Sequence, residues 1–304
     1  MTAPLSPAEG ARLLKLATNA SVTVAVILIA AKGVAYWQTS SMSILASLVD
    51  SLMDSGASLL NLVAVRYALA PADRQHRFGH GKAESIAALA QSTFIIGSGL
   101  FLLFEAARRL VDPAPLQAYG LGLAVMVFTI IATAALLLLQ GYVIRRTGSA
   151  AIRADALHYR TDLLTNSGVI VALLLAQYGW PGMDPLFAIG AGLYILWSAR
   201  AIMRDAFNEL LDRELPDEQR AQIRAIAEGH PEVRGVHDLR TRSSGRIDFI
   251  ELHLELDGGM SLFRSHTISD EVEAAIIAAI PAADVVIHQD PAGIVEEQQD
   301  EQLL

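Results

Sequence analysis

Residues Ala118–Ile144 read AYGLGLAVMVFTIIATAALLLLQGYVI, a stretch of the chain without a charged side chain. A helix needs about 20 apolar residues to cross the roughly 30 Å of hydrocarbon in a bilayer. This stretch is therefore long enough and apolar enough to span a membrane. Comparable stretches lie on both sides of it, and together they predict six spans, at Leu13–Trp37, Ser41–Leu69, Glu84–Leu110, Ala118–Ile144, Ala154–Tyr178 and Pro185–Met203.

The composition fits a membrane protein with a polar appendage. Hydrophobic residues make up 53% of the chain, the mean hydropathy is +0.39, and only 18% of residues are charged. The net charge of −9 argues against a nucleic-acid partner. The absence of cysteine excludes disulfides and thiolate metal sites, so any metal must be held by imidazole and carboxylate groups. We expect no organic cofactor.

Positive charges are distributed unevenly among the links between the predicted spans. Cytoplasmic loops of membrane proteins carry an excess of Lys and Arg. The links between spans one and two and between spans five and six carry none, and Arg108 and Arg109 near the end of span three are the exception. The distribution predicts that both termini are cytoplasmic, on the side of Arg12, Lys15, Arg66, Arg74, Arg77, Lys82, Arg145, Arg146, Arg153, Arg204 and Arg213.

The composition changes after about Asp212, and from Pro216 the chain has the pattern of a small soluble domain. Apolar and polar residues alternate along Arg246–Leu256, as in a strand with one buried face. Ser243-Ser244-Gly245 fits a hairpin turn. We predict the order helix, strand, strand, helix, strand, at Asp217–Glu228, Gly235–Arg242, Arg246–Leu256, Ser269–Ile280 and Asp284–His288.

Three regions of the chain follow from these patterns. We predict an all-α six-helix transmembrane domain at residues 1–212 and a cytoplasmic α+β domain of αββαβ order at residues 213–292. The tail at residues 293–304 is acidic and polar, which is typical of a disordered segment. Met1–Gly10 lacks the pattern of a cleaved signal peptide, so we expect the first apolar stretch to be a span.

Two pairs of ionisable residues lie inside predicted spans. Span two contains Asp50-Ser-Leu-Met-Asp54, which makes it the least obvious span, and span five contains His158-Tyr-Arg-Thr-Asp162. Residues four apart share one face of a helix, so each pair points in one direction. A carboxylate in hydrocarbon costs about 2.5–3.5 kcal/mol, so three unpaired carboxylates would cost on the order of 8–10 kcal/mol. Such a cost requires a compensating partner.

Several partners could compensate these carboxylates. Arg153 or Arg160 could pair with them, or they could form a proton relay. Three carboxylates and one neutral imidazole also supply the four ligands that tetrahedral zinc takes. Two pairs on two spans favour a metal or metal/proton site over a single ion pair. Nitrogen and oxygen ligands suit zinc, ferrous iron, cadmium or manganese.

At these residues the sequence resembles the cation diffusion facilitator family, and most closely its bacterial ferrous-iron/zinc efflux branch. The resemblance covers nearly the whole chain, including the loop His76-Arg-Phe-Gly-His80-Gly-Lys-Ala-Glu84. It implies a homodimeric metal/proton antiporter in the bacterial inner membrane. It also implies Zn²⁺, with Fe²⁺ and Cd²⁺ as alternatives, as the substrate and regulatory ligand. The transport site implied by the resemblance consists of Asp50, Asp54, His158 and Asp162.

A second cluster lies in the link between spans two and three. His76 and His80 are four residues apart and Asp73 precedes them, but Gly79 and Gly81 argue against a stable helix here. The spacing alone leaves both a solvated loop and a metal site open. By resemblance, Asp73, His76 and His80 match positions that hold a secondary metal.

A third cluster lies in the C-terminal domain, where His288 and Asp290 would share one face of a strand and Asp290 could bridge two ions. A histidine on a strand is more often a surface residue than a ligand. However, seven of the 8 histidines of the chain fall in the three clusters. By resemblance, this cluster is a binuclear metal site at the dimer interface, formed from His237, His253, His266, His288 and Asp290.

The resemblance also implies an interprotomer contact and a mechanism. Lys82 and Asp212 match a salt bridge that links the membrane helices to the dimer partner. Metal from the cytoplasm would bind the transport site, and the spans would then rock to open it to the other side. Protons compete with metal for deprotonated ligands. We expect His158 to carry the proton because an unperturbed imidazole has a pKa of about 6.5.

Two other functions are compatible with a buried metal site. A membrane metalloenzyme would leave one zinc position open to water, but the chain contains no His-Glu-x-x-His and no Gly-x-Ser-x-Gly motif. A metal-gated channel or sensor would lack saturable, proton-coupled flux. We therefore predict a secondary active transporter and not an enzyme.

Overall fold

The computed structural model describes residues 7–39, 42–111, 121–177 and 183–293. It divides into two compact units, Met1–Phe207 and Asn208–Leu304. The acidic tail predicted to be disordered falls almost entirely outside the described residues. So do the predicted span limits at Ser41, Ala118 and Tyr178.

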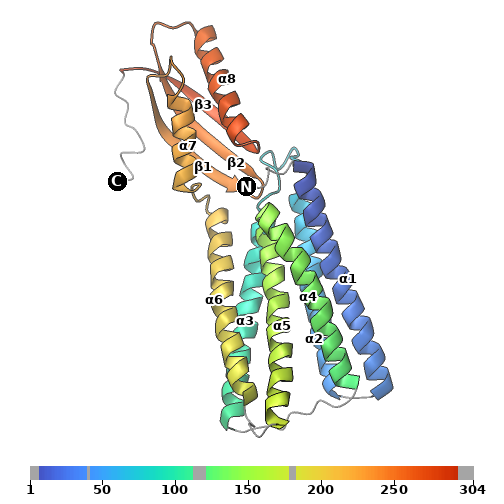
Figure 1. Ribbon diagram of the computed structural model, residues 1–304. Helices are drawn as coiled ribbons and strands as arrows, with labels where there is room; N and C mark the ends of the chain where they lie inside the picture. The colour runs from blue at the N-terminus through green and yellow to red at the C-terminus, as the bar shows by residue number, and fades with distance from the viewer. Residues whose placement is uncertain (1–6, 40–41, 112–120, 178–182, 294–304) are drawn as a thin grey trace. The chain divides into compact units, whose positions relative to one another are not determined.

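Six long helices form the first unit, and Figure 1 shows them side by side. Their lengths follow from the apolar stretches, because a helix satisfies all its backbone hydrogen bonds internally and can therefore lie in lipid. The helices are α1 (Pro7–Thr39), α2 (Met42–Ala68), α3 (Ala83–Val111), α4 (Leu121–Thr147), α5 (Ala150–Gln177) and α6 (Met183–Leu210).

The predicted count of six apolar spans needs one correction. Within the described residues, five helices are long and apolar enough to cross a membrane, and α5 is not among them. Span two was expected to be the least obvious from hydropathy, but α5 is less apolar: α2 has a mean hydropathy of 1.3 over Ser47–Ala68, the lowest of the five helices that qualify. Asp155, His158 and Asp162 lower the apolarity of α5, although its 28 residues are long enough to span.

The polarity of α5 is explained by its position among the other helices. One core cluster packs Ile152 of α5 against residues of α1, α2 and α4, and a second packs Leu157 against α3 and α6. The first half of α5 is thus surrounded by protein rather than lipid. A hydropathy average cannot distinguish these two environments.

Helix α6 is longer than its apolar stretch. The prediction ended span six at Met203, but α6 continues to Leu210. Arg204 and Asp205 end the apolar run without ending the helix. Asp205 instead accepts a hydrogen bond from Arg153 of α5, with 3.0 Å between Nη1 and Oδ2.

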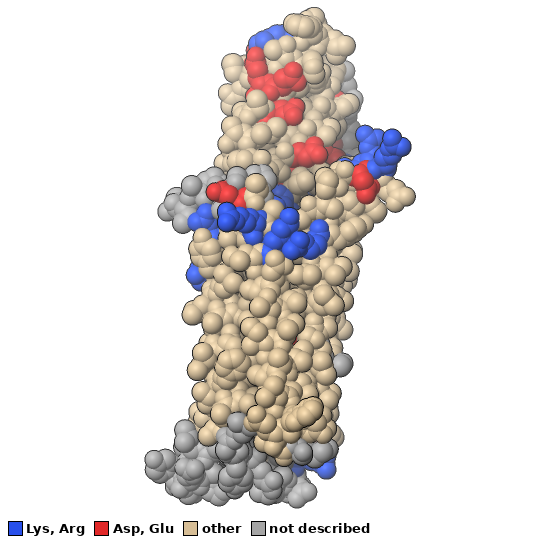
Figure 2. Space-filling model, turned by 90° about the vertical axis from the view of Figure 1, so that its right-hand side faces the viewer, with Lys and Arg blue, Asp and Glu red and all other residues tan. Residues whose placement is uncertain are grey.

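Most of the charged side chains of the helical unit lie at one end, although Glu105 and Arg108 of α3 lie toward the other. Figure 2 shows Lys and Arg in a band at one end of the bundle, while its side is almost free of charged groups. Arginines lie in the last turns of α2 and α4, at Arg66, Arg145 and Arg146. An apolar wall with a basic end is the pattern expected of a membrane bundle.

The second unit is a small α+β domain, and its predicted element order is confirmed. It contains α7 (Asp217–Glu228), β1 (Gly235–Ser244), β2 (Ile247–Leu256), α8 (Leu262–Ala279) and β3 (Ala283–Pro291). The sheet order is β1-β2-β3, with β1 antiparallel and β3 parallel to β2.

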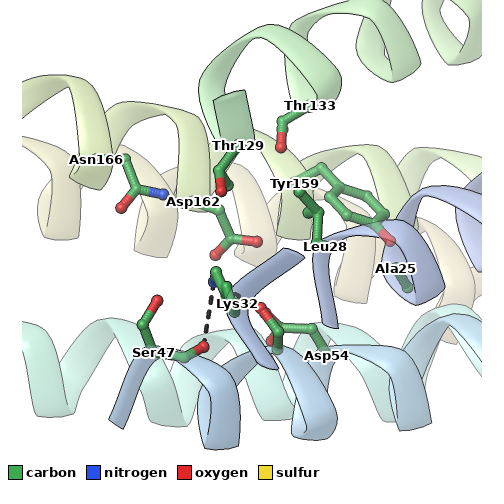
Figure 3. Close-up of a pocket in the computed structure, with 11 residues that line it drawn as sticks. Ala25, Leu28, Lys32, Ser47, Asp54, Thr129, Thr133, Tyr159, Asp162 and Asn166 are labelled. Carbon is green, nitrogen blue, oxygen red and sulfur yellow. Dashed lines mark hydrogen bonds between the residues drawn. The ribbon is translucent and has the colours of Figure 1, made fainter. Parts of the chain in front are cut away.

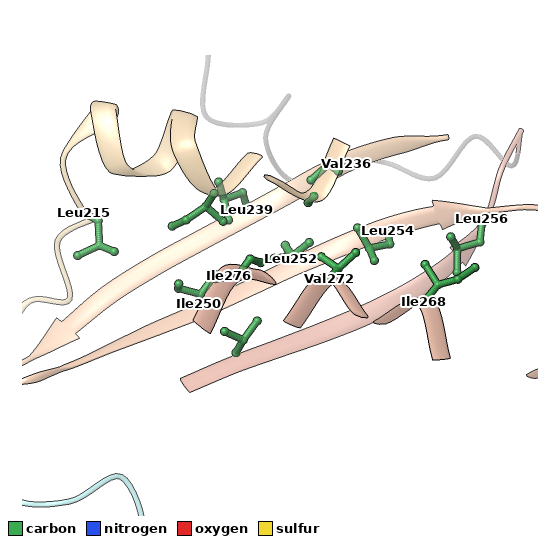
Figure 4. Close-up of a cluster of buried hydrophobic side chains, with 13 residues drawn as sticks. Leu215, Val236, Leu239, Ile250, Leu252, Leu254, Leu256, Ile268, Val272 and Ile276 are labelled. Atoms are coloured by element: carbon green, nitrogen blue, oxygen red, sulfur yellow. The ribbon is translucent and has the colours of Figure 1, made fainter. Parts of the chain in front are cut away.

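The core of this domain lies on one face of the sheet. Leu252 and Leu254 of β2 pack with Ile223 of α7 and with Ile268 and Val272 of α8 (Figure 4). Side chains alternate between the faces of a strand, so the odd-numbered residues of β2 point to the opposite face. That opposite face therefore remains available for polar residues.

Helix α8 begins before the predicted Ser269. Ser261 caps it, since its hydroxyl accepts a hydrogen bond from the backbone nitrogen of Arg264 at 3.3 Å. The first turn carries Leu262 and Phe263, whose side chains are exposed. An exposed apolar turn breaks the amphipathic periodicity, and for this reason the sequence pattern placed the start too late.

Candidate metal centres

Three of the four predicted transport residues meet in the middle of the bundle. Asp54 comes from α2, and His158 and Asp162 come from α5. The Nε2 atom of His158 lies 3.0 Å from Oδ1 of Asp54 and 3.8 Å from Oδ2 of Asp162. Asp50 lies one helical turn before Asp54 on α2, and its side chain is outside the described part of the structure.

The geometry of these three groups suits a metal ion. Ligand atoms at about 2.0–2.1 Å from tetrahedral zinc lie about 3.3 Å from one another. The two measured separations lie on either side of this value. The Nε2 atom of His158 is buried and makes no hydrogen bond of normal geometry, so it is available as a ligand.

Polar side chains line a cavity beside this cluster. Asp54 and Asp162 contribute to its wall, together with Asn166, Tyr159 and Lys32 (Figure 3). A second cavity, between α3, α5 and α6, also includes Asp54, His158 and Asp162 in its lining. The carboxylates thus border two cavities, one among α1, α2, α4 and α5 and the other between α3, α5 and α6.

The arginines proposed as alternative partners lie elsewhere. Arg153 pairs with Asp205 of α6, and Arg160 is exposed. Lys32 is the basic residue that the structure brings to the cavity, and sequence reasoning missed it. A lysine deep inside the apolar stretch of α1, 17 residues after Lys15 at the start of that stretch, was the available signal.

Sequence reasoning also missed a buried carboxylate network one turn before His158. Asp155 of α5 is fully buried. Its Oδ2 accepts hydrogen bonds from Ser21 of α1 at 2.6 Å and Gln140 of α4 at 2.7 Å, and its Oδ1 accepts one from Gln91 of α3 at 3.4 Å. This network ties four helices together and fixes the segment of α5 that carries His158.

We expect Asp155→Ala to destabilise the bundle by about 2–5 kcal/mol, because it leaves buried donors unpaired. Thermal unfolding of the purified protein in detergent measures this effect. Thr23→Ala is the control, since the exposed Thr23 hydroxyl donates only to its own helix, at the Asn19 carbonyl. Equal unfolding temperatures for the two variants would show that the network does not stabilise the bundle.

The second predicted cluster is present in the loop between α2 and α3. Asp73 Oδ1 lies 3.5 Å from Nδ1 of His76, and Asp73 Oδ2 lies 3.3 Å from Nε2 of His80. The segment is not helical, and Gly79 has a φ of 83°, which favours glycine. The ring of Tyr67 packs against that of His80 at 4.5 Å and helps to bury it.

The loop keeps the carboxylate of Asp73 ionised. Backbone N–H groups of His76 and Gln75 donate to its Oδ1 at 2.7 and 2.8 Å. These hydrogen bonds lower the pKa of Asp73 below its usual value. A carboxylate that stays deprotonated in mild acid can still act as a metal ligand there.

The third cluster lies on the face of the sheet opposite the helices. His237, His253 and His288 are direct neighbours across the three strands. Asp290 Oδ2 lies 2.8 Å from Nδ1 of His253 and 3.3 Å from Nε2 of His237. Its Oδ1 lies 3.2 Å from Nε2 of His288. One carboxylate thus contacts three imidazoles and could bridge two ions.

The structure adds two acidic residues to this cluster and leaves one histidine apart from it. Glu255 Oε1 lies 3.2 Å from Nδ1 of His237, and Asp238 can share a metal with His237 and His253. Asp238 has a φ of 47° and lies at an irregularity in the pairing of β1 with β2. The sequence pattern did not predict this irregularity. His266 lies on α8, where its Nε2 is 3.6 Å from Oδ2 of Asp270, and among the described residues it belongs to none of the groups that could hold a metal ion.

The predicted salt bridge between protomers involves residues of both units. Lys82 precedes α3, and Asp212 follows α6. Asp212 has a φ of 55° and its Oδ1 lies 3.4 Å from Nη1 of Arg242 within the same unit. The pairing of Lys82 with Asp212 of a second chain stays a prediction.

Comparisons with known proteins match both units. The family model of the cation efflux transmembrane domain matches residues 19–211, and that of the cation efflux protein cytoplasmic domain matches residues 215–292. The cation-efflux pump FieF of Klebsiella pneumoniae subsp. pneumoniae is 51% identical over 284 residues, which cover 93% of this chain and 95% of the relative. FieF of Shigella flexneri serotype 5b is 50% identical over the same shares.

A solved structure also resembles the second unit. The metal-bound C-terminal domain of the CzcD transporter from Thermotoga maritima is 32% identical, with a TM-score of 0.25. The match covers 26% of this chain and 93% of that domain. The family models and the identity over nearly the full length lead to one conclusion: the chain belongs to the cation efflux, or cation diffusion facilitator, family, and is a multi-pass membrane transporter for the efflux of divalent metal cations rather than an enzyme.

Proposed function

We propose that the protein exports zinc in exchange for protons by alternating access, with ferrous iron and cadmium as alternative substrates. The observation that carries this proposal is the position of His158 Nε2, 3.0 Å from Asp54 and 3.8 Å from Asp162. A borderline-soft ion that accepts imidazole and carboxylate ligands fits this set. With Asp50, the transport site would have four ligands.

Protons would use the same ligands as the metal. Each ligand must be deprotonated to bind the ion, so proton binding and metal binding exclude one another. His158 is the expected proton carrier because an unperturbed imidazole titrates near physiological pH. Both cavities extend from the site toward the end of the bundle opposite Arg66, Arg145 and Arg146, so alternating access would require a second route to open toward the basic end.

The proposal includes the orientation of the protein in the membrane and the roles of the parts outside the transport site. The basic end of the bundle would face the cytoplasm of a bacterium, with both termini there and the bundle in the inner membrane. Residues 213–292 would form a cytoplasmic domain that senses metal and joins two chains into a homodimer. The loop cluster at Asp73, His76 and His80 would hold a secondary ion. Lys82 and Asp212 would join the two protomers.

Proton coupling can be tested with purified protein in liposomes that contain a trapped zinc indicator. A vesicle interior more acidic than the medium should accelerate zinc entry, because protons leaving the vesicle drive zinc inward. The reverse gradient should slow zinc entry, and an ionophore that exchanges potassium for protons should abolish the difference. Equal initial rates under both gradients would refute antiport while leaving metal transport intact.

A further inference from the structure

Lys32 is a basic residue in the apolar helix α1, and only 7% of its surface is exposed. A charged side chain at the centre of a membrane costs about 2.5–3.5 kcal/mol. Hydrogen bonds compensate part of this cost. The Nζ atom donates to Ser51 Oγ at 2.6 Å and to the Ser47 carbonyl oxygen at 3.1 Å, both on α2. These two acceptors hold the Nζ atom against α2.

The ammonium group of Lys32 is held beside the proposed transport site. Ser51, its hydrogen-bond partner, lies one helical turn before Asp54 on α2. Lys32, Asp54 and Asp162 line the same cavity, and Figure 3 shows Lys32 extending into it from α1. A fixed positive charge and two carboxylates thus share one enclosed space.

Lys32 changes the charge balance of this space. The proposed ligands Asp50, Asp54 and Asp162 carry a formal charge of −3, and a divalent ion leaves −1. The ammonium of Lys32 brings the loaded site to zero. A neutral assembly is cheaper to enclose in a low-dielectric protein than a charged one. The same ammonium repels the divalent ion and therefore weakens its binding.

We propose that Lys32 is a tethered counter-cation of the transport site, which lowers the affinity for divalent metal and thereby permits its release. This inference rests on the proposed function, because it requires Asp54 and Asp162 to bind the substrate. A monovalent and a divalent cation in one cavity repel each other enough to weaken binding at least about tenfold. Affinity differences among variants of one site appear mostly in the dissociation rate. A site without Lys32 would hold its metal too long.

The test measures zinc affinity and zinc flux in Lys32→Met and Lys32→Gln. Both are made in a background carrying Asp73→Ala and Asp290→Ala, so that the other two clusters do not contribute to the binding signal. Zinc titration calorimetry in detergent should give a Kd at least about tenfold lower for both variants. Flux into liposomes should show a lower KM and a maximal rate reduced about tenfold.

The choice of variants separates charge from structure. Lys32→Gln keeps a hydrogen-bond donor for Ser51 and Ser47 but loses the charge, whereas Lys32→Arg keeps the charge and should not show the tighter binding. Lys15→Met removes the same charge from an exposed position on α1 and should leave affinity unchanged. A lysine that only tethered α1 to α2 would instead give weaker binding and a lower unfolding temperature in Lys32→Met, and near-normal values in Lys32→Gln.

The outcomes distinguish this inference from the function on which it rests. Zinc binding that does not depend on Asp54 would refute the proposed transport site itself. Binding that depends on Asp54 but is no tighter in Lys32→Gln would overturn only the role of Lys32. Tighter binding with slower flux in both neutral variants would support it.

Discussion

Replacing Asp54 with asparagine is expected to reduce zinc transport at least a hundredfold. Oδ1 of Asp54 lies 3.0 Å from Nε2 of His158, and the two groups come from different helices. Asparagine keeps the shape of the side chain but removes the charge that attracts a divalent ion. In a low-dielectric site the loss of one anionic ligand is worth several kcal/mol, and each 1.4 kcal/mol is tenfold in affinity.

The matched control for this prediction is Asp217→Asn. Asp217 is also an aspartate, but 99% of its side chain is exposed at the start of α7. Both variants should be purified in similar yield and unfold at similar temperatures, so that lost flux cannot be attributed to lost protein. Undiminished flux in Asp54→Asn would show that Asp54 is not part of the transport site.

Replacing Asp290 with asparagine should have the second largest effect, on metal binding by the C-terminal unit. Asp290 is the residue whose carboxylate oxygens contact three histidines, at 2.8 Å, 3.2 Å and 3.3 Å. The neutral amide cannot bridge ions as a carboxylate does. We expect zinc affinity at this cluster to fall at least a hundredfold.

Calorimetry can isolate this cluster in a background that carries Asp54→Asn and Asp73→Ala. His230→Gln is the matched control, because His230 pairs with Glu271 at 2.8 Å and lies outside the cluster. It should bind zinc as the background protein does. Unchanged zinc stoichiometry and affinity in Asp290→Asn would exclude a metal site on this face of the sheet.

Residue spacing predicted those parts of the sites that a single element determines. The spacing of His158 and Asp162 places them on one face of α5, and that of His288 and Asp290 places them on one face of β3. Contacts between different elements could not be predicted from residue spacing. The alignment of His237, His253 and His288 across three strands depends on strand register, and β1 contains an irregularity just after His237.

Other features of the transport region were not predicted from the sequence because their residues belong to no spaced motif. Lys32 and Asp155 are single ionisable residues within helices, and their roles depend on partners from other helices. The polarity of α5 depends on the other helices, which surround its first half. Asp50, the fourth proposed ligand, has its side chain outside the described part, so its place in the transport site stays a prediction.

The most direct test of the central claim is metal flux by the purified wild-type protein in liposomes, with zinc, cadmium, ferrous iron and manganese compared in parallel. A transport site of carboxylates and one imidazole predicts saturable flux of zinc and cadmium, measurable flux of ferrous iron, and slower flux of manganese, which prefers oxygen ligands. Flux of these metals no faster than in protein-free liposomes would contradict the account. So would a rate that rises linearly with metal concentration, as through a channel.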